Sequence, residues 1–260
     1  MVIDSVLARV LALVVVGGCG TTLDQPGYAD EGSPDAAVPQ APARICDGPR
    51  VRVVYVVPSD RTPVSEYVVA LDNAFTQLRV FVREQLGTGE TFCFDGVETI
   101  RTPHTASWYM ANPSPRGAEL TFWDNALDDA FALTGGAFYD PDNIWNYFFD
   151  VDEVEGQRLG SSYSVVVHPS SLLRGLTGEF DRTRCQSVGL AGFHLGYSLG
   201  APAPPGCAEG AATCAADSLM WQGYTTFPTT YFVSEQKTFL TTNPFMVASD
   251  PLNTVSSCAQ

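Results

Sequence analysis

The segment Val51–Val57 constrains the fold most, because nearly every residue in it is β-branched and apolar, and it ends at Pro58. An apolar pattern on both faces predicts a strand that is buried on both sides. An amphipathic helix is predicted next over Ser65–Leu86, since apolar residues recur at helical spacing and Gly87 follows as a stop. A buried strand followed by a helix indicates an α/β arrangement at the start of the domain.

Strands and helices continue to alternate along the chain. Further strands are predicted over Thr91–Ile100, Trp145–Phe149 and Tyr163–Val167. Further helices are predicted over Leu120–Leu133, Ser187–Leu199 and Ser234–Leu240, with a loop through Met220. Because the C-terminal part is mainly helical, the predicted fold class is α+β with an α/β N-terminal part.

Composition excludes two classes of protein. The hydrophobic share of 45% and the charged share of 17% over 260 residues are typical of a globular domain and exclude a disordered one. The chain has 14 basic and 29 acidic residues, a formal charge of −15, so it lacks the basic stripe that nucleic acid needs. We therefore expect no nucleic-acid partner.

The N-terminal segment has the pattern of an export signal. The apolar run Val10–Val16 is too short to span a bilayer but fits the core of a signal peptide. The following Gly17-Gly18-Cys19 resembles a bacterial lipobox, in which the cysteine is lipidated. An ordinary secretory signal with an incidental cysteine is the alternative, since Arg9 is the only basic residue before the run.

This pattern predicts three parts of the chain and their location. Residues 1–18 are the predicted lipoprotein signal peptide, residues 19–45, rich in Pro, Ala, Gly and Asp, a flexible linker, and residues 46–260 the folded domain. The chain is then exported and anchored to the bacterial cell envelope through lipid on Cys19, facing the periplasm or the outer surface. Without the lipid it would be secreted.

Six cysteines remain if Cys19 carries lipid. An even number in an exported protein predicts disulfides. Cys46 and Cys93 flank the first strand and begin the second, and they form the first expected pair. Cys185 and Cys207 bracket a predicted helix and its exit loop, which leaves Cys214 with Cys258. The competing choice, Cys207 with Cys214, closes a short local loop.

The segment from Val188 to Cys207 is a Gly-rich helix that ends at Gly200 and continues as a Pro-rich loop. It resembles the zinc-binding segment of metzincin-type metallopeptidases, whose motif is His-Glu-x-x-His-x-x-Gly-x-x-His followed by a Met-turn. Laid on this chain without gaps, the motif runs from Phe193 to Ala203, and its glycine falls on Gly200. Ser218-Leu-Met220-Trp221 is similar to the Met-turn.

The flanking sequence extends the resemblance to bacterial metallopeptidase-like proteins over roughly residues 50 to 247. The similar stretches are Val53–Asp60, Arg101–Tyr109, Phe131–Gly136 and Pro204–Cys207. Membership of this group implies a single zincin-like domain with a mixed sheet, an active-site-type helix and a Met-turn.

The residues at the functional positions of the motif depart from the family. Phe193 and Tyr197 stand at the first two zinc-ligand positions, Ala203 at the third, and His194 at the position of the general base. A catalytic zinc needs three protein ligands and a water, and neither Phe nor Ala has a lone pair to donate. We therefore expect no zinc and no other cofactor. The implied function is that of a catalytically inactive peptidase homologue whose former cleft binds a peptide or protein.

Two alternatives remain open at the level of sequence. The chain has three histidines, and His194 lies about 100° away from the ligand face of the helix. A non-standard site of His194 with Asp217 or Glu209 would make the chain an active zinc-dependent endopeptidase. The other alternative is a purely structural envelope lipoprotein. His104 fits a loop or helix-capping role, and His168 a strand end.

Acidic clusters give a weaker signal. The pairs Asp128-Asp129 and Asp140/Asp142 could serve as a glycosidase pair or a calcium site. The best calcium candidate is the run Asp150–Gly156, which alternates carboxylates and ends in glycine but lacks the full calcium-loop pattern. Solvated turns are the simpler interpretation of such runs, and no Gly-x-Ser-x-Gly elbow of a serine hydrolase occurs.

Overall fold

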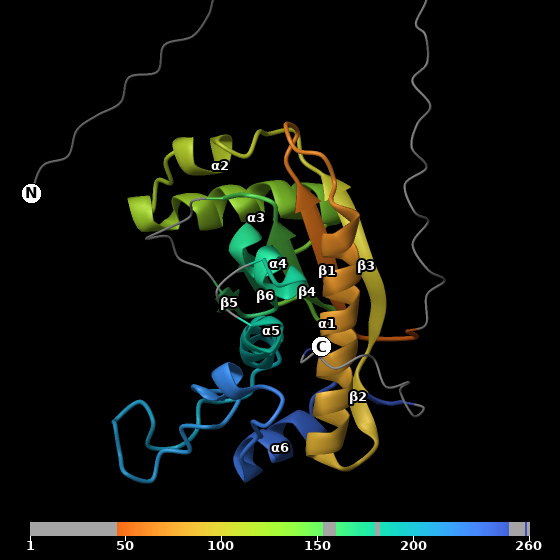
Figure 1. Ribbon diagram of the computed structural model, residues 1–260, viewed down its shortest axis with the longest axis vertical. Coiled ribbons are helices and arrows are strands. Elements are labelled where there is room, and N and C mark those ends of the chain that lie inside the picture. Colours follow the sequence, from red (N-terminus) through yellow and green to blue (C-terminus); the bar gives the residue numbers. More distant parts are fainter. Residues whose placement is uncertain (1–45, 153–159, 180–182, 250–257, 259–260) are drawn as a thin grey trace, which may run out of the picture. The chain divides into compact units, whose positions relative to one another are not determined.

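The computed structural model describes residues 46–152, 160–179, 183–249 and 258 (Figure 1). The predicted signal peptide, the lipidation site Cys19 and the linker lie outside the described residues. Glu153, Glu155 and Gly156 of the calcium candidate also lie outside them.

The central element is a five-stranded mixed sheet with the strand order β3-β1-β4-β6-β5. Four strands are parallel, and the short edge strand β5 is antiparallel to β6. The strands are β1 (Arg50–Val57), β3 (Phe94–Arg101), β4 (Asn143–Phe149), β5 (Gly160–Ser162) and β6 (Val165–His168). The interior position of β1 explains its unbroken apolar sequence, and the mixed sheet with helices agrees with the predicted α+β class.

Helices cover both faces of this sheet. One face packs against α1 (Ser65–Leu86), α4 (Ser170–Thr177) and α5 (Arg184–Ser198). The other face packs against α2 (Trp108–Ala111) and α3 (Thr121–Thr134), which the short turn η1 (Ala118–Leu120) precedes. Helix α1 matches the bounds predicted for it and ends at Gly87, which has the left-handed φ of 69° that a helix-terminating glycine adopts readily.

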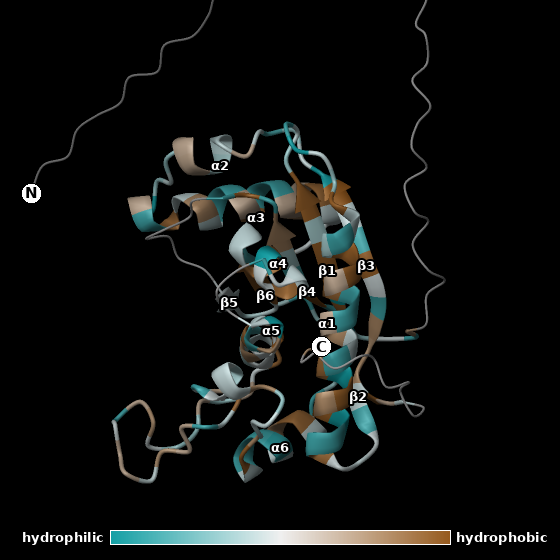
Figure 2. Cartoon of the chain, in the orientation of Figure 1, coloured by the Kyte–Doolittle hydropathy of each residue, from teal (hydrophilic) through white to brown (hydrophobic). Residues whose placement is uncertain are grey.

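Strand β1 supplies side chains to both hydrophobic layers. Val53 and Tyr55 point into the layer under α1, α4 and α5, whereas Val54 and Val56 point into the layer under α3. Figure 2 shows β1 coloured mostly as hydrophobic, whereas α1 carries both hydrophilic and hydrophobic residues, as a helix with one buried face must.

The C-terminal part packs along the end of α1 that extends past the sheet (Figure 1). It contains the short turn η2 (Gly223–Thr226), helix α6 (Ser234–Thr241) and strand β7 (Met246–Ala248). Strand β7 pairs in antiparallel fashion with β2 (Glu90–Phe92) and forms a second, two-stranded sheet. None of the helices within the described residues is long and apolar enough to cross a membrane.

Two predicted strands are wrong in their extent. The strand expected over Thr91–Ile100 is divided at Cys93, because β2 pairs with β7 whereas β3 pairs with β1. The strand expected over Tyr163–Val167 begins only at Val165, because Tyr163 has a φ of 53° and forms the turn between β5 and β6. The short elements α2, α4, β5 and β7 were not predicted.

Three disulfides join the six cysteines of the domain. Cys46 is bonded to Cys93, which is the expected pair. The other two expected pairs are wrong: Cys185 is bonded to Cys258, and Cys207 to Cys214. The competing local pairing is therefore the one that the fold adopts.

Local turns explain the two revised pairings. Hydrogen bonds from Gly210 N to Cys207 O and from Cys214 N to Ala211 O fold this loop back on itself, so the two Cα atoms lie 4.5 Å apart. At the C-terminus, Cys258 N donates to Gln77 Oε1 of α1 at 3.0 Å, which holds Cys258 beside the start of α5.

Candidate functional site

Helix α5 carries the motif positions and begins at a well-formed cap. The Thr183 side chain accepts a hydrogen bond from Gln186 N at 3.2 Å, and Gln186 Oε1 accepts one from Thr183 N at 3.2 Å, which completes a capping box. Val188, Ala191 and Leu195 form the buried face of the helix. This anchoring fixes the rotation of α5 and hence the direction of each motif side chain.

Glycines on α5 allow neighbouring segments to approach closely. A Cβ at Gly189 would lie 2.3 Å from Tyr224 O, and a Cβ at Gly196 would lie 2.3 Å from Met220 Sδ. A Cβ at Gly192 would meet a leucine of α1 at 2.5 Å. The lack of a side chain at Gly196 lets Met220 pack directly against the helix, and the lack of one at Gly189 does the same for the backbone of Tyr224.

Met220 is fully buried in a hydrogen-bonded turn. Ser218 Oγ accepts a bond from Met220 N at 3.3 Å and donates to Gln236 Oε1 of α6 at 2.9 Å. Trp221 N donates to Ser218 O at 2.9 Å, and Leu219 N donates to Tyr231 O at 2.9 Å. A turn that carries a buried methionine thus lies against α5.

Phe193 and Tyr197, which the sequence resemblance aligns with the first two zinc-ligand positions, belong to an aromatic cluster. The rings of Phe193 and Tyr197 meet edge to face with centroids 4.9 Å apart, and Tyr224 adds a third ring 5.5 Å from Phe193. Tyr197 Oη donates a hydrogen bond to Met220 O at 3.3 Å. Burial raises the pKa of the Tyr197 hydroxyl, so this group stays protonated and is a poor metal ligand.

Two further motif positions follow the helix. Gly200 has a φ of 83°, a left-handed conformation that ends the α5 segment and favours glycine. Ala203 is half-buried in the Pro-rich loop beyond it and has only a methyl group to offer.

His194, at the position of the general base, points to another part of the molecule. A Cβ at Gly160 of β5 would lie 2.5 Å from His194 Nδ1, and the ring centroid of His168 at the end of β6 lies 5.1 Å from that of His194. His168 is buried and stacks on Phe148, and its Nε2 atom has no hydrogen-bond partner among the described residues. Burial, with a smaller contribution from His194, holds the pKa of His168 well below its usual value, so this ring is neutral.

The donor set at the motif positions does not fit a catalytic zinc. Phe193 and Ala203 have no donor atom, the Tyr197 hydroxyl donates to a carbonyl, and no carboxylate stands at the base position. Within the described residues, the only three His, Cys, Asp or Glu side chains whose ligand atoms lie within 4.8 Å of one another are Cys46, Cys93 and Asp95. The alternative set of His194 with Asp217 or Glu209 therefore does not assemble into such a group within the described part of the chain.

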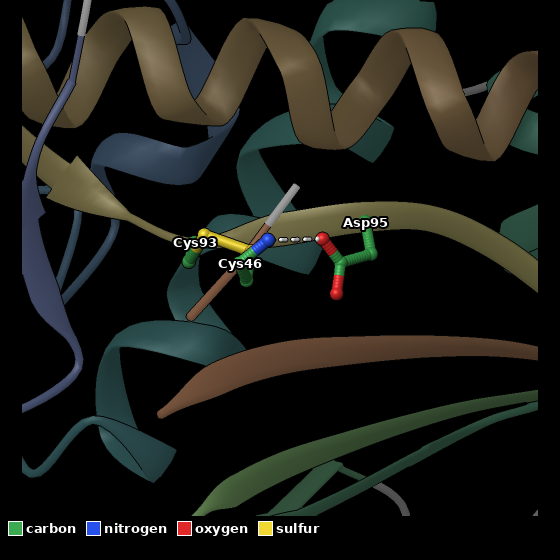
Figure 3. A group of neighbouring side chains, drawn as sticks. All are labelled: Cys46, Cys93 and Asp95. Atoms are coloured by element: carbon green, nitrogen blue, oxygen red, sulfur yellow. Dashed lines mark hydrogen bonds between the residues drawn. A yellow bond between two sulfur atoms is a disulfide. The ribbon is translucent and has the colours of Figure 1, made fainter. Parts of the chain in front are cut away.

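The group of Cys46, Cys93 and Asp95 is a structural junction and does not fit a metal (Figure 3). The two sulfur atoms are joined in a disulfide and offer no thiolate. Asp95 Oδ1 accepts a hydrogen bond from Cys46 N at 2.9 Å, and Oδ2 accepts one from Arg50 Nη1 at 3.0 Å. These contacts fasten the segment before β1 to the start of β3.

A second cluster of polar groups lies where the parallel strands end, and we call it the carboxyl edge. It comprises polar residues that follow four strands, together with Asp129 of α3. These residues are Arg61 after β1, His104 and Tyr109 after β3, Asp150 and Asp152 after β4, and Ser170 and Arg174 after β6. His104 Nδ1 lies 3.0 Å from each oxygen of Asp129, and the His104 ring stacks on Trp108 with centroids 3.6 Å apart. Tyr109 Oη donates to Asp129 Oδ2 at 2.6 Å. Burial, followed by this bond, raises the pKa of Tyr109.

Two carboxylates after β4 have opposite environments within the carboxyl edge. Asp150 is buried and accepts a bond from Tyr55 Oη at 3.1 Å, and its desolvation raises the pKa of this carboxyl. Asp152 accepts bonds from Ser170 Oγ at 2.5 Å and from Arg61 Nη2 at 2.8 Å, which together hold its pKa low. The Arg174 guanidinium lies 3.7 Å from Asp152 as a second ion pair.

These contacts bear on the calcium candidates. The described carboxylates of the Asp150–Gly156 run already pair with hydroxyl and guanidinium donors of the protein. Asp140 accepts bonds from Trp145 Nε1 at 2.8 Å and from Asp142 N at 2.9 Å, and its partner in the candidate pair, Asp142, is exposed. Asp129 is engaged by His104 and Tyr109, and the adjacent Asp128 is exposed on a different face of α3. Asp129, Asp140, Asp150 and Asp152 therefore already accept bonds from protein groups, whereas a calcium ion would need their oxygens as ligands.

A groove of about 680 Å³ opens on the other side of α5. Its walls come from the first half of α1, the end of α4 and the first turns of α5, and Cys258 borders it; the residues are Ser65, Glu66, Val69, Ala70, Asn73, Ala74, Gln77, Leu176, Thr177, Glu179, Arg184, Val188 and Cys258. Phe193 and Tyr197 do not line it, so this groove is distinct from the motif positions.

Several residues of the two clusters escape sequence reasoning. Tyr224, which completes the aromatic cluster, and Arg61 of the carboxyl edge come from separate segments and belong to no motif. Asp129 is named by the sequence only as one of an acidic pair with Asp128, not as the partner of His104 and Tyr109. One usable signal exists: polar residues directly after predicted parallel strands meet at one edge of the sheet. That signal selects Arg61, His104 and Asp150, but it does not place Asp129, which lies within a helix, beside them.

No protein-family model matches the sequence, and no curated protein is similar enough to be recognised as a relative. Among solved structures, the fold is similar to that of OgpA from Akkermansia muciniphila. One crystal form of the wild-type protein gives a TM-score of 0.53 at 16% identity over 83% of this chain, and another gives 0.52 at 17% identity over 77%. A complex of catalytically inactive OgpA with an O-glycopeptide substrate, glycodrosocin, gives 0.52 at 16% identity. This chain covers 64–66% of the length of OgpA.

Proposed function

We propose that the chain is a metzincin-type peptidase homologue that has lost its zinc site and binds a peptide or protein segment beside α5. One observation carries this proposal. A motif helix with a buried methionine turn beneath it is assembled, yet the positions that would hold the metal carry an aromatic pair whose rings lie 4.9 Å apart. Such a pair provides an apolar contact surface in place of a Lewis acid.

The fold similarity supports a peptide as the class of ligand. OgpA shares the fold, and its substrate is an O-glycopeptide. In this chain the half-buried rings of Phe193 and Tyr197 offer rigid aromatic contacts of the kind that dominate binding sites for peptide side chains. We infer that this face of α5 binds a peptide but does not hydrolyse it.

The proposed location is the bacterial cell envelope, with lipid on Cys19 as the anchor. Three disulfides support folding in an oxidising compartment outside the cytosol. Expression of the full chain with radiolabelled fatty acid tests the anchor, because wild-type protein should incorporate label and Cys19→Ser should not. Equal labelling of the two proteins would contradict lipidation at this residue.

The decisive test of the lost zinc site is a metal measurement with a restored variant as a positive control. Wild-type protein dialysed against zinc and then buffer should retain far less than one equivalent by atomic emission. The combined changes Phe193→His, His194→Glu, Tyr197→His and Ala203→His put the family motif back and should bring zinc to about one equivalent, since the ligand set is then complete. Stoichiometric zinc in the wild type would overturn the proposal.

Peptide binding is tested by screening an immobilised peptide library with the purified domain. Tyr197→Ala should weaken the selected peptides at least tenfold, whereas Tyr231→Ala, an exposed tyrosine outside the aromatic cluster, should leave binding unchanged. Cleavage of the same peptides that a chelator and His194→Ala both abolish would favour the active endopeptidase instead. Failure of any peptide to bind would favour a purely structural role.

A further inference from the structure

Two exposed tyrosines form a close pair with tilted rings at the end of the sheet opposite to the carboxyl edge. Tyr139 lies in the loop between α3 and β4, and Tyr163 lies in the turn between β5 and β6. Their side chains are 67% and 57% exposed, and the ring centroids are 3.9 Å apart. Phe138, 39% exposed, meets Tyr163 edge to face and contacts Phe131, which links the pair to the interior.

Both tyrosines adopt a backbone conformation that bulky residues normally avoid. Within the described residues, Tyr139 and Tyr163 are the two non-glycine positions with positive φ, at 59° and 53°. Glycine would adopt these angles without strain, so the large side chains are kept at a cost to folding. Strained residues of this kind concentrate at ligand sites, where the position of the side chain matters more than stability.

The two loops that carry the pair are held firmly to each other. The Asp140 carboxylate accepts bonds from Trp145 Nε1 and from Asp142 N, and these bonds hold the pKa of Asp140 low despite its partial burial. Ser164 Oγ donates to Asp140 O at 3.4 Å, and Trp145 N donates to Ser164 O at 2.8 Å. The tyrosines are therefore fixed in place before any ligand arrives, which lowers the entropic cost of binding.

The chemistry of the pair suits a neutral ligand with one apolar face and several hydroxyl groups. Hydrogen bonding to Tyr163 raises the pKa of Tyr139, so Tyr139 is the neutral donor within the pair, and lone pairs of the phenol oxygens remain to accept from hydroxyl groups of a ligand. A stable protein interface needs about 800 Å² from each partner. Aromatic side chains expose about 150–250 Å² each at most, so three partly exposed ones fall short of that area. A single sugar ring matches this area.

We propose that Tyr139 and Tyr163 form a binding site for a neutral saccharide. The C–H face of a pyranose ring packs on an exposed tyrosine ring, and the phenol groups bond to its hydroxyls. The site does not depend on peptide binding at α5, although the two are connected: Tyr163 follows directly after β5, whose Gly160 contacts His194.

The test is binding of defined saccharides to the full secreted chain. Methyl β-galactoside, methyl α-N-acetylgalactosaminide and chitobiose are titrated by saturation-transfer NMR. At least one should bind to the wild type, and Tyr139→Ala and Tyr163→Ala should each weaken that binding at least tenfold. Tyr231 lies elsewhere on the surface and is 39% exposed, so Tyr231→Ala is the matched control and should leave saccharide binding unchanged. The absence of binding by all three sugars, or equal affinity in the tyrosine variants, would overturn the proposal.

Glycine substitutions separate binding from folding. Tyr139→Gly and Tyr163→Gly relieve the backbone strain, so their melting temperatures should equal or exceed that of the wild type while the saccharide signal is lost. A clear fall in melting temperature would instead mean that the pair stabilises the fold, which overturns the proposal. Sedimentation of the wild type should show the same mass with and without sugar, and loss of a dimer in Tyr139→Gly would identify a second copy of the chain as the true partner. Loss of peptide binding at α5 leaves all these outcomes unaffected.

Discussion

The region around α5 and the carboxyl edge of the sheet differ in what holds them together. The α5 region comprises α5, the Met220 turn and η2. Its contacts are mainly apolar and covalent, namely glycines against Tyr224 and Met220, aromatic rings and a disulfide at Cys185, and its hydrogen bonds, such as that from Tyr197 Oη to Met220 O, join groups that carry no charge. The carboxyl edge is held by hydrogen bonds and ion pairs among groups such as Asp129 and Asp152.

The two regions differ in the kind of side chain that they bring together. In the α5 region an aromatic pair, Phe193 and Tyr197, stands where the sequence resemblance would place zinc ligands. At the carboxyl edge, titratable groups gather but pair with one another, which leaves the carboxylates of Asp129 and Asp152 satisfied. We therefore expect the carboxyl edge to make stability depend on pH through its carboxylates, whereas the α5 region adds a pH dependence mainly through the buried, neutral His168 beside His194, which destabilises the fold at low pH.

The largest expected effect comes from the disulfide of the α5 region. Replacing Cys185 and Cys258 together with serine opens a loop with a sequence separation of 73 residues, whereas replacing Cys207 and Cys214 opens one of 7. Loop-closure entropy predicts losses in the free energy of unfolding of about 4 and about 2.5 kcal/mol. Chemical denaturation at pH 5 and pH 8 measures both. Equal losses for the two double variants, or losses that depend strongly on pH, would contradict the prediction that the Cys185–Cys258 bond stabilises the fold more because it closes the longer loop.

Close packing under α5 gives the next effect. In Gly189→Ala the new methyl group would lie 2.3 Å from the backbone carbonyl of Tyr224, which cannot rotate away, so we expect a loss of about 3 kcal/mol. Gly192→Ala is the matched control, because its methyl group meets the movable end of Leu78. The change from glycine to alanine also raises helix propensity by up to about 1 kcal/mol, which should offset the cost of moving Leu78. We therefore expect the stability of this control to lie near that of the wild type. Thermal unfolding of both variants measures the difference, and equal losses would argue against the tight contact at Tyr224.

The sequence predicts single helices better than the contacts of the carboxyl edge for a physical reason. Helix periodicity and glycine stops are local, so the bounds of α1 and the end of α5 before Gly200 follow from neighbouring residues, although α5 begins at Arg184 and not at the predicted Ser187. Contacts such as Asp152 with Arg61 join residues 91 positions apart, and no local pattern records which strand lies beside which.

The wrong disulfide pairs have the same origin. Cys185 and Cys258 meet because the C-terminal segment returns to α1, where Gln77 binds Cys258 N. Sequence spacing had favoured Cys185 with Cys207 because they bracket one helix. The short strand β5 and the turn at Tyr163 were missed because an apolar run such as Tyr163–Val167 does not indicate where a strand reverses.

At the carboxyl edge, the buried Asp129 should contribute about 2 kcal/mol. Asp129→Asn keeps the shape but replaces one acceptor oxygen with an NH₂ group, so the contacts with His104 Nδ1 and Tyr109 Oη are both kept only if Nδ1 gives up its proton, and the charge that strengthens them is lost. Urea denaturation measures the loss, and Asp128→Asn on the exposed side of the same helix is the control. A loss no larger than that of the control would show that the His104–Asp129–Tyr109 network does not stabilise the edge.

The smallest and most diagnostic effect concerns Asp150 and Asp152, whose pKa values move in opposite directions from 3.8. The raised pKa of Asp150 means that the fold favours its protonated form, so its contribution is present at low pH and is lost as pH rises through that pKa. The lowered pKa of Asp152 means that its contribution is present above pH 4 and is lost as pH falls through its folded value.

Asp150→Asn should therefore gain stability relative to the wild type as pH rises from 3 to 7. Asp152→Asn should lose about 1 kcal/mol at pH 7, a modest value because its ion pairs are partly exposed, and this loss should vanish towards pH 3. Unfolding free energies across this range measure both slopes. Slopes of the same sign would mean that the two carboxylates do not have the separate environments that distinguish this edge from the α5 region.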